Sequence, residues 1–439
     1  MAGALVMSWE SSYLNFSRAN RSHLDTHNQA ALDSRVANEK RQNCFDKFLA
    51  LGLPTKREEA WKFTSLTDFK NIEWKSLEDS DVQLTHEQMQ EVSKQLPSEF
   101  LNFVFINGVL NKTLSDDAND LIELKELAES DFMDEGGVED RLLNLAQAFV
   151  NKKICLSVVK NKVMERPVQV LFVQSSKNSI YSSEKLKIQL AENSEMKLLL
   201  HTISFINTSA DAVNLSIEIH AEKSSRLTFI QLQNEDLESF HFSQCRLSLD
   251  SSAQILTFAL SLGNKLVRNY YHLKFFGENA LAQVYGLGVG EATQHLDNYT
   301  FIQHATGKNQ SIQHYKSILS GAAHSVFRGR VLIALNAQKA DSAQLNNNLL
   351  LTSTAQAESV PQLEIFADDV KAAHGATFGQ LNKDEIFYFL SRGINQYEAV
   401  KMLSYGFAKE LLLKIENQEL QKYLISALNK KLERMVQNA

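Results

Sequence analysis

The chain has 439 residues, and its 45 Lys and Arg residues against 52 Asp and Glu residues give a formal net charge of -7. Hydrophobic residues at 44% and charged residues at 22% are typical of a folded protein with a sizeable core, which excludes a disordered chain. The acidic balance disfavours a general nucleic-acid-binding protein, because binding to phosphates requires a surplus of basic residues.

The N-terminus and the cysteines indicate the compartment. Residues 1–14 lack the basic and apolar regions of a signal peptide, and no apolar run approaches the roughly 18 residues that span a membrane. Cys44, Cys155 and Cys245 are too sparse for a disulfide framework and suit a reducing compartment. We therefore expect a cytoplasmic protein without membrane contact. These cysteines alone also cannot supply the usual thiolate set of an iron–sulfur cluster.

Residues 1–150 are expected to form a mostly helical N-terminal region with one short hairpin. The dipeptide Asn107-Gly108 between two apolar segments predicts this hairpin over residues 103–110. Helical spacing of apolar residues returns over residues 121–150, which predicts a further helical segment there.

From about residue 154 the apolar period changes from that of a helix to that of a strand. Alternating segments recur, and each is followed by a polar turn. The turns begin at Ala191, Ala221, Asp250, Gly277 and Gly307, about 27–30 residues apart. A repeat of this length predicts stacked coils, because one unit is too small to bury its apolar side chains alone.

We therefore expect a mainly β fold with a parallel β-helix core over residues 151–380. The low counts of 4 Pro and 17 Gly and the lack of hairpin signals within the repeat favour stacked coils. An antiparallel sandwich with long loops is the alternative from the pattern alone. Residues 381–439 return to helical spacing, with apolar stripes on charged helices. These stripes should contact either the β core or a partner.

The sequence lacks the common nucleotide-binding and hydrolase motifs. It has neither a Walker A motif nor the Gly-x-Ser-x-Gly sequence of a nucleophile elbow. Gly286, Gly288 and Gly290 do not match the dinucleotide fingerprint and instead predict close packing between strands. We expect no nucleotide bound by this chain.

Two sets of histidines are candidates for metal binding. His295, His304, His314 and His324 recur at similar intervals, but this spacing differs from the coil length. Hydrogen-bonded histidines within the core are therefore the simpler interpretation. His374 differs, because it follows the last strand-like segment and its small neighbours leave the imidazole accessible. A neutral imidazole can bind iron or move protons, although a structural histidine is the simpler interpretation of the pattern alone.

Several motifs resemble those of the SufB/SufD family of iron–sulfur cluster assembly proteins. The matching positions are Pro54, Glu59, Trp61 and Thr64 near the N-terminus, and residues 341–344, 348–351, 361–365, 369–370, 374–377 and 387–394. The matches reach from residue 54 to beyond residue 400. Within the family, His374-Gly375-Ala376-Thr377 is most similar to the SufD branch, because SufB carries His-Glu-Ala there. The chain also lacks the late cysteine expected of SufB.

The resemblance implies a right-handed parallel β-helix with helical regions at both ends. It implies a scaffold subunit rather than an enzyme, with ATP hydrolysis supplied by a SufC-like ATPase. The scaffold would pair with a SufB-like subunit through the β-helices, or with a second copy of itself when alone. The C-terminal helices would dock the ATPase. The docking residues implied in this way are Ser391, Arg392, Gly393, Tyr405, Phe407 and Glu410.

His374 is the metal-binding residue that the resemblance implies. It would contribute to a transient iron–sulfur cluster shared with the SufB-like subunit. Many relatives carry a cysteine two positions earlier, where this chain has Ala372. The iron donor, the cluster nuclearity and the participation of a flavin do not follow from the sequence.

Two other functions are open at this point. A carbohydrate-active β-helix enzyme would need paired carboxylates along a cleft, whereas the adjacent Asp368 and Asp369 would point to opposite faces of a strand. A SufB-like subunit acting alone would need the late cysteine that is missing. We therefore expect a scaffold for iron–sulfur cluster assembly.

Overall fold

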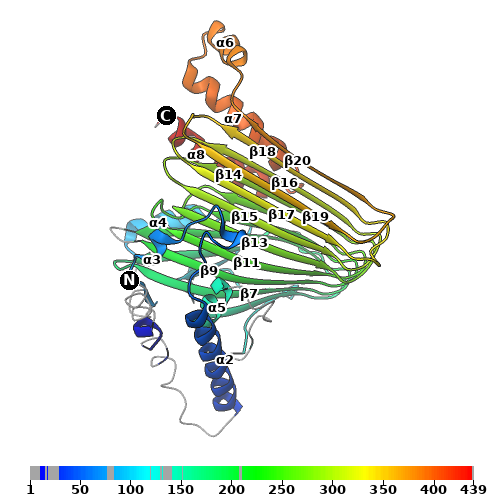
Figure 1. The fold of residues 1–439 in the computed structure, drawn as a ribbon. Helices are drawn as coiled ribbons and strands as arrows, with labels where there is room; N and C mark the ends of the chain where they lie inside the picture. The colour runs from blue at the N-terminus through cyan, green and yellow to red at the C-terminus, as the bar shows by residue number, and fades with distance from the viewer. Residues whose placement is uncertain are drawn as a thin grey trace.

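The computed structural model describes residues 10–14, 17, 29–76, 84–118, 120–128, 131, 141–150, 152–206 and 210–437. Two ten-stranded sheets lie against each other as a parallel β-solenoid with helices at both ends (Figure 1). The expected β-helix is confirmed. The antiparallel sandwich is wrong, because neighbouring strands along the core pair in parallel.

Successive strands of the core alternate between the two sheets. The first sheet contains β4 (Ile122–Glu126), β5 (Lys152–Val158), β7 (Ile180–Leu190), β9 (Asp211–Ala221), β11 (Phe240–Leu249), β13 (Leu266–Phe275), β15 (His295–His304), β17 (His324–Ile333) and β19 (Gln356–Ile365), with β1 (Lys75–Ser76) beside β7. The second sheet contains β3 (Val109–Leu110), β2 (Leu101–Ile106), β6 (Val168–Ser176), β8 (Glu195–Ile206), β10 (Arg226–Gln233), β12 (Gln254–Ser261), β14 (Leu281–Gly290), β16 (Gln310–Leu319), β18 (Asp341–Leu350) and β20 (Lys371–Gly379).

The coils stack in a register that places like residues above one another. In the first sheet Leu247 of β11 pairs with Ile219 of β9 on one side and with Leu273 of β13 on the other. Ile302 of β15 continues the same row. All four side chains are buried in the main core cluster between the sheets. This repeated burial explains why a unit of about 30 residues needs its neighbours to be stable.

The turns show how the coils reverse direction with few glycines. Most turns at one edge contain a non-glycine residue with φ between 58° and 61°, and these residues are Asn161, Asn193, Ser224, Ser252, Asn279, Lys308 and Lys339. The left-handed conformation is unfavourable for such residues, so it needs compensation. The N–H of Ser252 donates to the Glu278 oxygen of the next coil at 2.9 Å. Stacked turns thus hydrogen-bond to each other, which stabilises the strained backbone.

The expected helix over residues 121–150 is wrong in its first part. Residues Ile122–Glu126 form β4, which pairs antiparallel with β5. Ile122 is buried and Leu124 packs against the core, while Glu123 is exposed. This alternation has the period of a strand. By pairing with β5, β4 supplies hydrogen-bond partners to the backbone at the edge of that strand. Within the described residues of this segment, the helix is α5 (Arg141–Ala148).

The hairpin at Asn107 and Gly108 joins β2 to β3, with φ values of 47° and 76° at these residues. β2 also pairs in parallel with β6 and so extends the second sheet. Strands that precede residue 151 therefore belong to the same two sheets as the repeats. Buried apolar side chains on β2, such as Phe103, complete the core at this end.

The other helices flank the solenoid. The N-terminal ones are α2 (Gln29–Leu51), the short η1 (Glu59–Trp61), α3 (Thr67–Lys70) and α4 (His86–Lys94), and the C-terminal ones are α6 (Lys383–Ser391), α7 (Gln396–Leu412) and α8 (Gln418–Gln437). None of the helices in the described part of the chain is long and apolar enough to cross a membrane.

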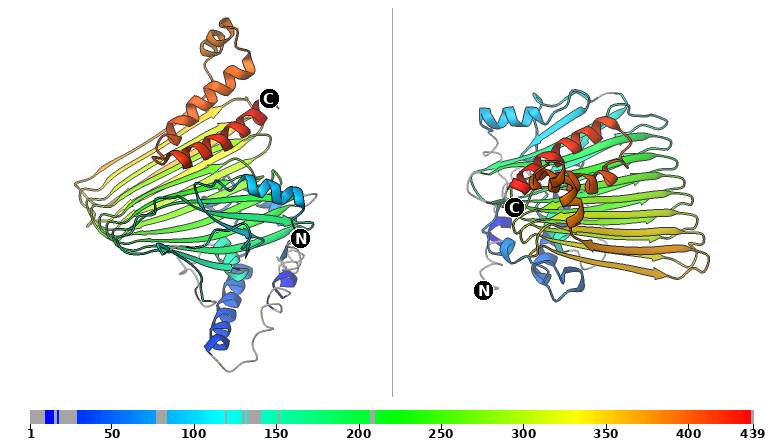
Figure 2. Two further views of the ribbon diagram at one scale, coloured as in Figure 1. Left: turned by 180° about the vertical axis from the view of Figure 1, so that it is seen from behind. Right: turned by 90° about the horizontal axis from the view of Figure 1, so that it is seen from above.

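The C-terminal apolar stripes contact the second sheet. Leu411 of α7 and Leu424 and Leu428 of α8 are buried in one cluster with Phe258 and Leu260 of β12. Figure 2 shows α8 lying across the strands, while α6 extends away from the solenoid. The prediction that these stripes meet the β core or a partner is therefore confirmed for α7 and α8.

Candidate functional site

The two ends of the solenoid differ. At the N-terminal end the last strands are β3 and β4, which pair antiparallel with β2 and β5. At the other end β19 and β20 are the last strands, and no described strand pairs with their outer edges. Pro361 lies within β19. Proline has no N–H to donate to a neighbouring strand, so within sheets it occurs at edges or bulges. The C-terminal end of the solenoid thus presents free strand edges.

His374 lies on the terminal strand at this open end. In the parallel register of β20 and β18 it pairs with Gln344, which in turn pairs with Gln313 of β16. Both glutamines are buried, so this row points into the solenoid. His374 continues the row but is exposed. Its imidazole is therefore an interior position that a further coil would cover.

The surroundings of His374 leave room for another molecule. Ala372 and Ala376 lie two positions before and after His374 on the same inward-facing side of β20. They pair with Ser342 and Asn346 of β18. The side chains of Ala372 and Ala376 are single methyl groups, which are too small to shield the imidazole. Among the described residues, neither amide atom of the Gln344 side chain has a hydrogen-bond partner. A buried amide without partners is costly, and it lies next to the exposed ring.

His374 alone cannot hold a metal ion. No group of three or more His, Cys, Asp or Glu side chains in the described residues could hold one. Cys44, Cys155 and Cys245 are all buried, and burial raises the pKa of the Cys155 and Cys245 thiols. Neither thiol is therefore a reactive thiolate near neutral pH. Any iron at His374 requires ligands from outside the described part of this chain.

The four recurring histidines do not form a metal-binding row. His295 and His324 do pair in register on β15 and β17, with ring centres 4.8 Å apart, because their separation equals one coil. The expectation from spacing was wrong for this pair. His304 bonds to Ser311 and His314 bonds to Asn347, each at a separate place. Burial lowers the pKa of His295 and of His304 to about 4, so both rings are neutral.

The N-terminal motif residues Glu59, Trp61 and Thr64 lie against the first sheet and contact its strands. The Trp61 ring lies 3.8 Å from the Arg268 guanidinium, and Thr64 donates to Asp297, which also pairs with Arg268. Glu59 accepts hydrogen bonds from Arg328 of β17 and from Gln362 of the terminal strand β19. These residues thus have a positioning role, because they join the N-terminal region to the open end.

The glycines on β14 are packing residues, as expected. A Cβ at Gly286 would lie 2.2 Å from the Tyr315 ring, and one at Gly288 would lie 2.8 Å from Leu296. Asp368 and Asp369 lie in the turn between β19 and β20 rather than within a strand, so the expectation of opposite strand faces does not apply to them. In this turn the Asp369 N–H donates to the Gln338 side chain.

The sequence-predicted docking residues lie in two places. Ser391 ends α6, and Arg392 and Gly393 begin the turn to α7, where Gly393 has φ 80°; all three are exposed. The Arg392 guanidinium lies 5.0 Å from the Tyr388 ring centre. α6 has no buried residue, and Phe387 is 69% exposed. Sequence reasoning included Phe387 in the matching motif 387–394 but not among the docking residues, although the apolar run 386–390 in a short helix was a usable signal.

Tyr405, Phe407 and Glu410 lie where α7 meets the solenoid. The Lys316 ammonium of β16 donates to the Phe407 carbonyl at 3.0 Å and to Glu410 at 2.5 Å. Tyr405 and Phe407 are partly buried against the cluster beneath α7. The hydrogen bond from Lys316 lowers the pKa of Glu410. These three residues therefore attach α7 to the second sheet.

Comparison with known proteins agrees with this geometry. Residues 172–407 match the family model described as the SufBD core domain of SUF system FeS cluster assembly, and residues 7–170 match the SufBD protein N-terminal region. The chain belongs to the SufBD family. The chain is similar to SufD, one branch of that family.

The relatives span nearly the whole chain. The chain is 28% identical to the iron–sulfur cluster assembly protein SufD of Escherichia coli, over 89% of this chain and 92% of the relative. It is 27% identical to an iron–sulfur cluster assembly SufBD family protein of Synechocystis, over 89% of each chain. It is 23% identical to the chloroplastic protein ABCI7 of Arabidopsis thaliana, over 87% of this chain and 83% of the relative. The role in iron–sulfur cluster assembly follows from this membership.

Proposed function

We propose that this protein is a cytoplasmic, non-catalytic scaffold subunit that pairs with a SufB-like subunit and contributes His374 to a nascent iron–sulfur cluster. The observation that carries the proposal is the exposed imidazole in an interior row at the open end of the solenoid. A second solenoid placed against this end would cover the ring and bring it next to ligands from the other subunit.

The free edges of β19 and β20 support such pairing. Unpaired strand edges are templates for another chain, and proteins usually protect them. Several apolar side chains near this end are exposed, including Leu345, Ile365 and Phe378. Burying them against a SufB-like subunit, or against a second copy when that subunit is absent, would remove apolar surface from water. The cluster would be cargo, shared across the interface and transient.

Ligation by one imidazole is chemically reasonable. Histidine replaces cysteine on iron in some iron–sulfur centres. The buried cysteines of this chain make thiolates from the partner necessary, and Ala372 offers no thiol beside His374. We infer that the partner supplies the sulfur ligands and this chain supplies the imidazole.

The C-terminal helices are the proposed docking site for a SufC-like ATPase. The exposed residues Ser391, Arg392 and Gly393, together with Phe387 on α6, would contact it. We propose that Tyr405, Phe407 and Glu410 serve this docking by fixing α7 on β16, so that movement of the ATPase reaches the solenoid. ATP binding and hydrolysis would occur on the ATPase, since this chain carries no Walker A motif. The N-terminal region (residues 1–150), the β-helix core (151–380) and the C-terminal helical domain (381–439) would thus have separate tasks.

The test is cluster assembly by the purified three-component complex. His374→Ala should leave the fold unchanged, because the ring is exposed in the single chain. It should also leave the co-purification of both partners unchanged, because the edges of β19 and β20 would supply most of the pairing contacts. It should abolish formation of the cluster, measured by its visible absorption and by iron content. Thr377→Ala on the same strand serves as the control and should behave like the unchanged protein. A normal cluster yield with His374→Ala would refute the proposal, and loss of co-purification would assign His374 to pairing instead.

A further inference from the structure

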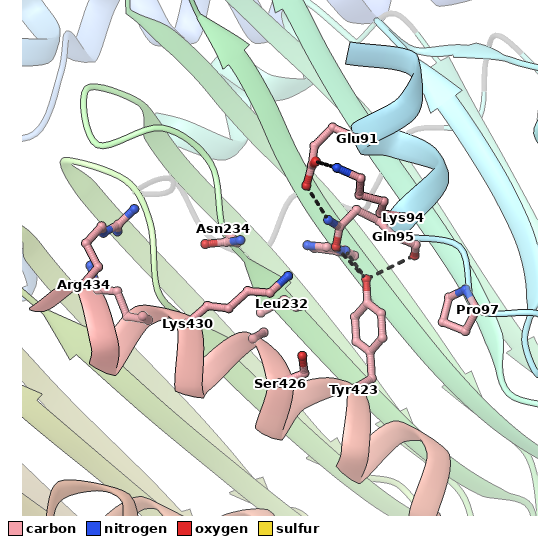
Figure 3. Close-up of a pocket in the computed structure, with 13 residues that line it drawn as sticks. Glu91, Lys94, Gln95, Pro97, Leu232, Asn234, Tyr423, Ser426, Lys430 and Arg434 are labelled. Carbon is pink, nitrogen blue, oxygen red and sulfur yellow. Dashed lines mark hydrogen bonds and ion pairs between the residues drawn. The ribbon is translucent and has the colours of Figure 1, made fainter. Parts of the chain in front are cut away.

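A cavity separate from the open end lies between two helices and the second sheet (Figure 3). Its volume is about 460 Å³, within the range of small-molecule sites. Residues from α4 and α8, from the middle of β8 and from the end of β10 line it. β10 and β20 are separated by β12, β14, β16 and β18, so the cavity is remote from His374.

Four basic side chains line the cavity. Lys94 of α4 and Lys430, Lys431 and Arg434 of α8 contribute positive charge, while Glu91 is the one carboxylate that lines it. Lys94 pairs with Glu91 at 3.0 Å, which neutralises one charge. The remaining cations come from a single helix and converge on one space. A chain with a net charge of -7 thus concentrates positive charge at this place.

The carboxylate behind this cluster cannot neutralise it. Glu291 accepts from Lys431 at 2.7 Å and from Arg434 at 2.9 Å, so one negative charge faces two positive ones. Lys430 has no hydrogen-bond or ion-pair partner among the described residues. Figure 3 shows Lys430 and Arg434 projecting from α8 on the side of Asn234. The Lys431 ammonium also donates to the Gln294 side chain at 2.8 Å, and burial lowers its pKa to about 8.

A buried imidazole adds a fixed polar group to the cavity wall. His201 of β8 is 1% exposed, and its Nδ1 atom lies 3.1 Å from the Tyr423 hydroxyl. Tyr423 is held in turn by Gln95. The Nε2 atom of His201 has no partner among the described residues. Burial lowers the pKa of His201 to about 3, so the ring is neutral and its free nitrogen can bond to a ligand.

We propose that this cavity binds a small molecule bearing a phosphate or carboxylate group. Lys430, Lys431 and Arg434 would surround the anionic group, and charge-assisted hydrogen bonds to it would be strong in a partly buried site. His201 and the Asn234 amide would orient the rest of the molecule. The site does not depend on the proposed cluster chemistry, because it shares no residue with the open end.

Isothermal titration calorimetry of the full chain at low ionic strength tests this site, with inorganic phosphate and citrate as separate probes. At least one anion should bind, and binding should weaken as salt is added. Lys430→Gln should weaken it about tenfold, because the substitution removes an unpaired cation. Binding of phosphate alone or of citrate alone supports the site and identifies the group that it takes.

Lys422→Gln is the matched control. Lys422 is also on α8 and is exposed, but it pairs with Glu419 and does not line the cavity. Its substitution should leave the affinity unchanged. The proposal is overturned if neither anion binds, or if Lys430→Gln and Lys422→Gln have equal effects. Equal thermal stability of the two variants would show that folding is not the cause of a difference.

Discussion

The Lys316 ammonium of β16 lies 4.4 Å from the centre of the Phe407 ring on α7, and it also donates to the Phe407 carbonyl. A strand of the solenoid and a helix that follows it are thus joined by a buried cation and an aromatic ring. Such a cation–π contact is stronger where water is excluded. The contact links the proposed docking helices to the β core.

Replacing Phe407 should weaken this attachment. We expect Phe407→Ala to lower the free energy of unfolding by about 1–3 kcal/mol, because a partly buried ring and its contact with Lys316 are lost. Urea unfolding monitored by circular dichroism measures the change. Phe387→Ala on exposed α6 is the control and should stay within about 0.5 kcal/mol of the unchanged protein. Equal effects of the two substitutions would contradict this role.

Replacing Phe387 should instead affect the ATPase. Phe387→Asp places a charge on the exposed apolar surface of α6 and should weaken binding of the SufC-like ATPase at least about tenfold, as expected for a central aromatic residue of an interface. Surface plasmon resonance with the purified partner measures the affinity. Phe276→Asp, at an exposed turn residue of the solenoid, should have no effect. Unchanged affinity with Phe387→Asp would remove α6 from the docking site.

Glu184 should make part of the stability depend on pH. Burial raises the pKa of this carboxyl to about 7, from an ordinary value of 4.5. The folded state therefore binds the proton more tightly, so the contribution of Glu184 is complete below pH 4.5 and is lost as the pH rises through 7. Glu184→Gln should remove the loss, with a benefit near zero at pH 4.5 and about 3 kcal/mol at pH 8.

The difference between the two proteins is the measurement that isolates Glu184. Buried histidines such as His201 and His304 have lowered pKa values and change stability in the opposite direction, but they are common to both proteins. Urea unfolding at several pH values gives the difference directly. A difference that does not grow between pH 4.5 and 8 would show that Glu184 is ionised in the folded protein.

Two glycines should respond to the same substitution in opposite directions. Gly286→Ala would force a Cβ against the Tyr315 ring at 2.2 Å, and we expect a loss of about 1–3 kcal/mol or more from this overpacking. Gly406→Ala on α7 meets no atom within 4 Å and should gain about 0.5–1 kcal/mol, since alanine favours the helix. Thermal unfolding of both variants tests the pair. A stable Gly286→Ala protein would mean that β14 and β16 can separate.

The repeat of apolar segments predicted most of the solenoid, because every coil buries the same positions. The turns from Ala191 to Gly307 lie between strands as the pattern indicates. β4 was missed because a single edge strand has no repeat to reveal it. The pairing of His295 with His324 was missed because four histidines were treated as one series, whereas only this pair is one coil apart.

The candidate site was predictable only in part. The accessibility of His374 followed from its small neighbours, but its place in the buried row of Gln313 and Gln344 required the register. Likewise, the contacts of Phe407 and Glu410 with Lys316 join residues about 90 positions apart, which local patterns do not indicate. The cavity beneath α8 depends on α4 and α8 meeting on one sheet, and no local motif encodes such an encounter.

The place of the proposed pairing surface limits how large an assembly could grow. Identical units that join through two different surfaces can add copies indefinitely and form fibres. Pairing through the outer edges of β19 and β20 alone would use one surface of each chain. Two chains joined in this way would leave no such edge for a third, so the association would close as a pair.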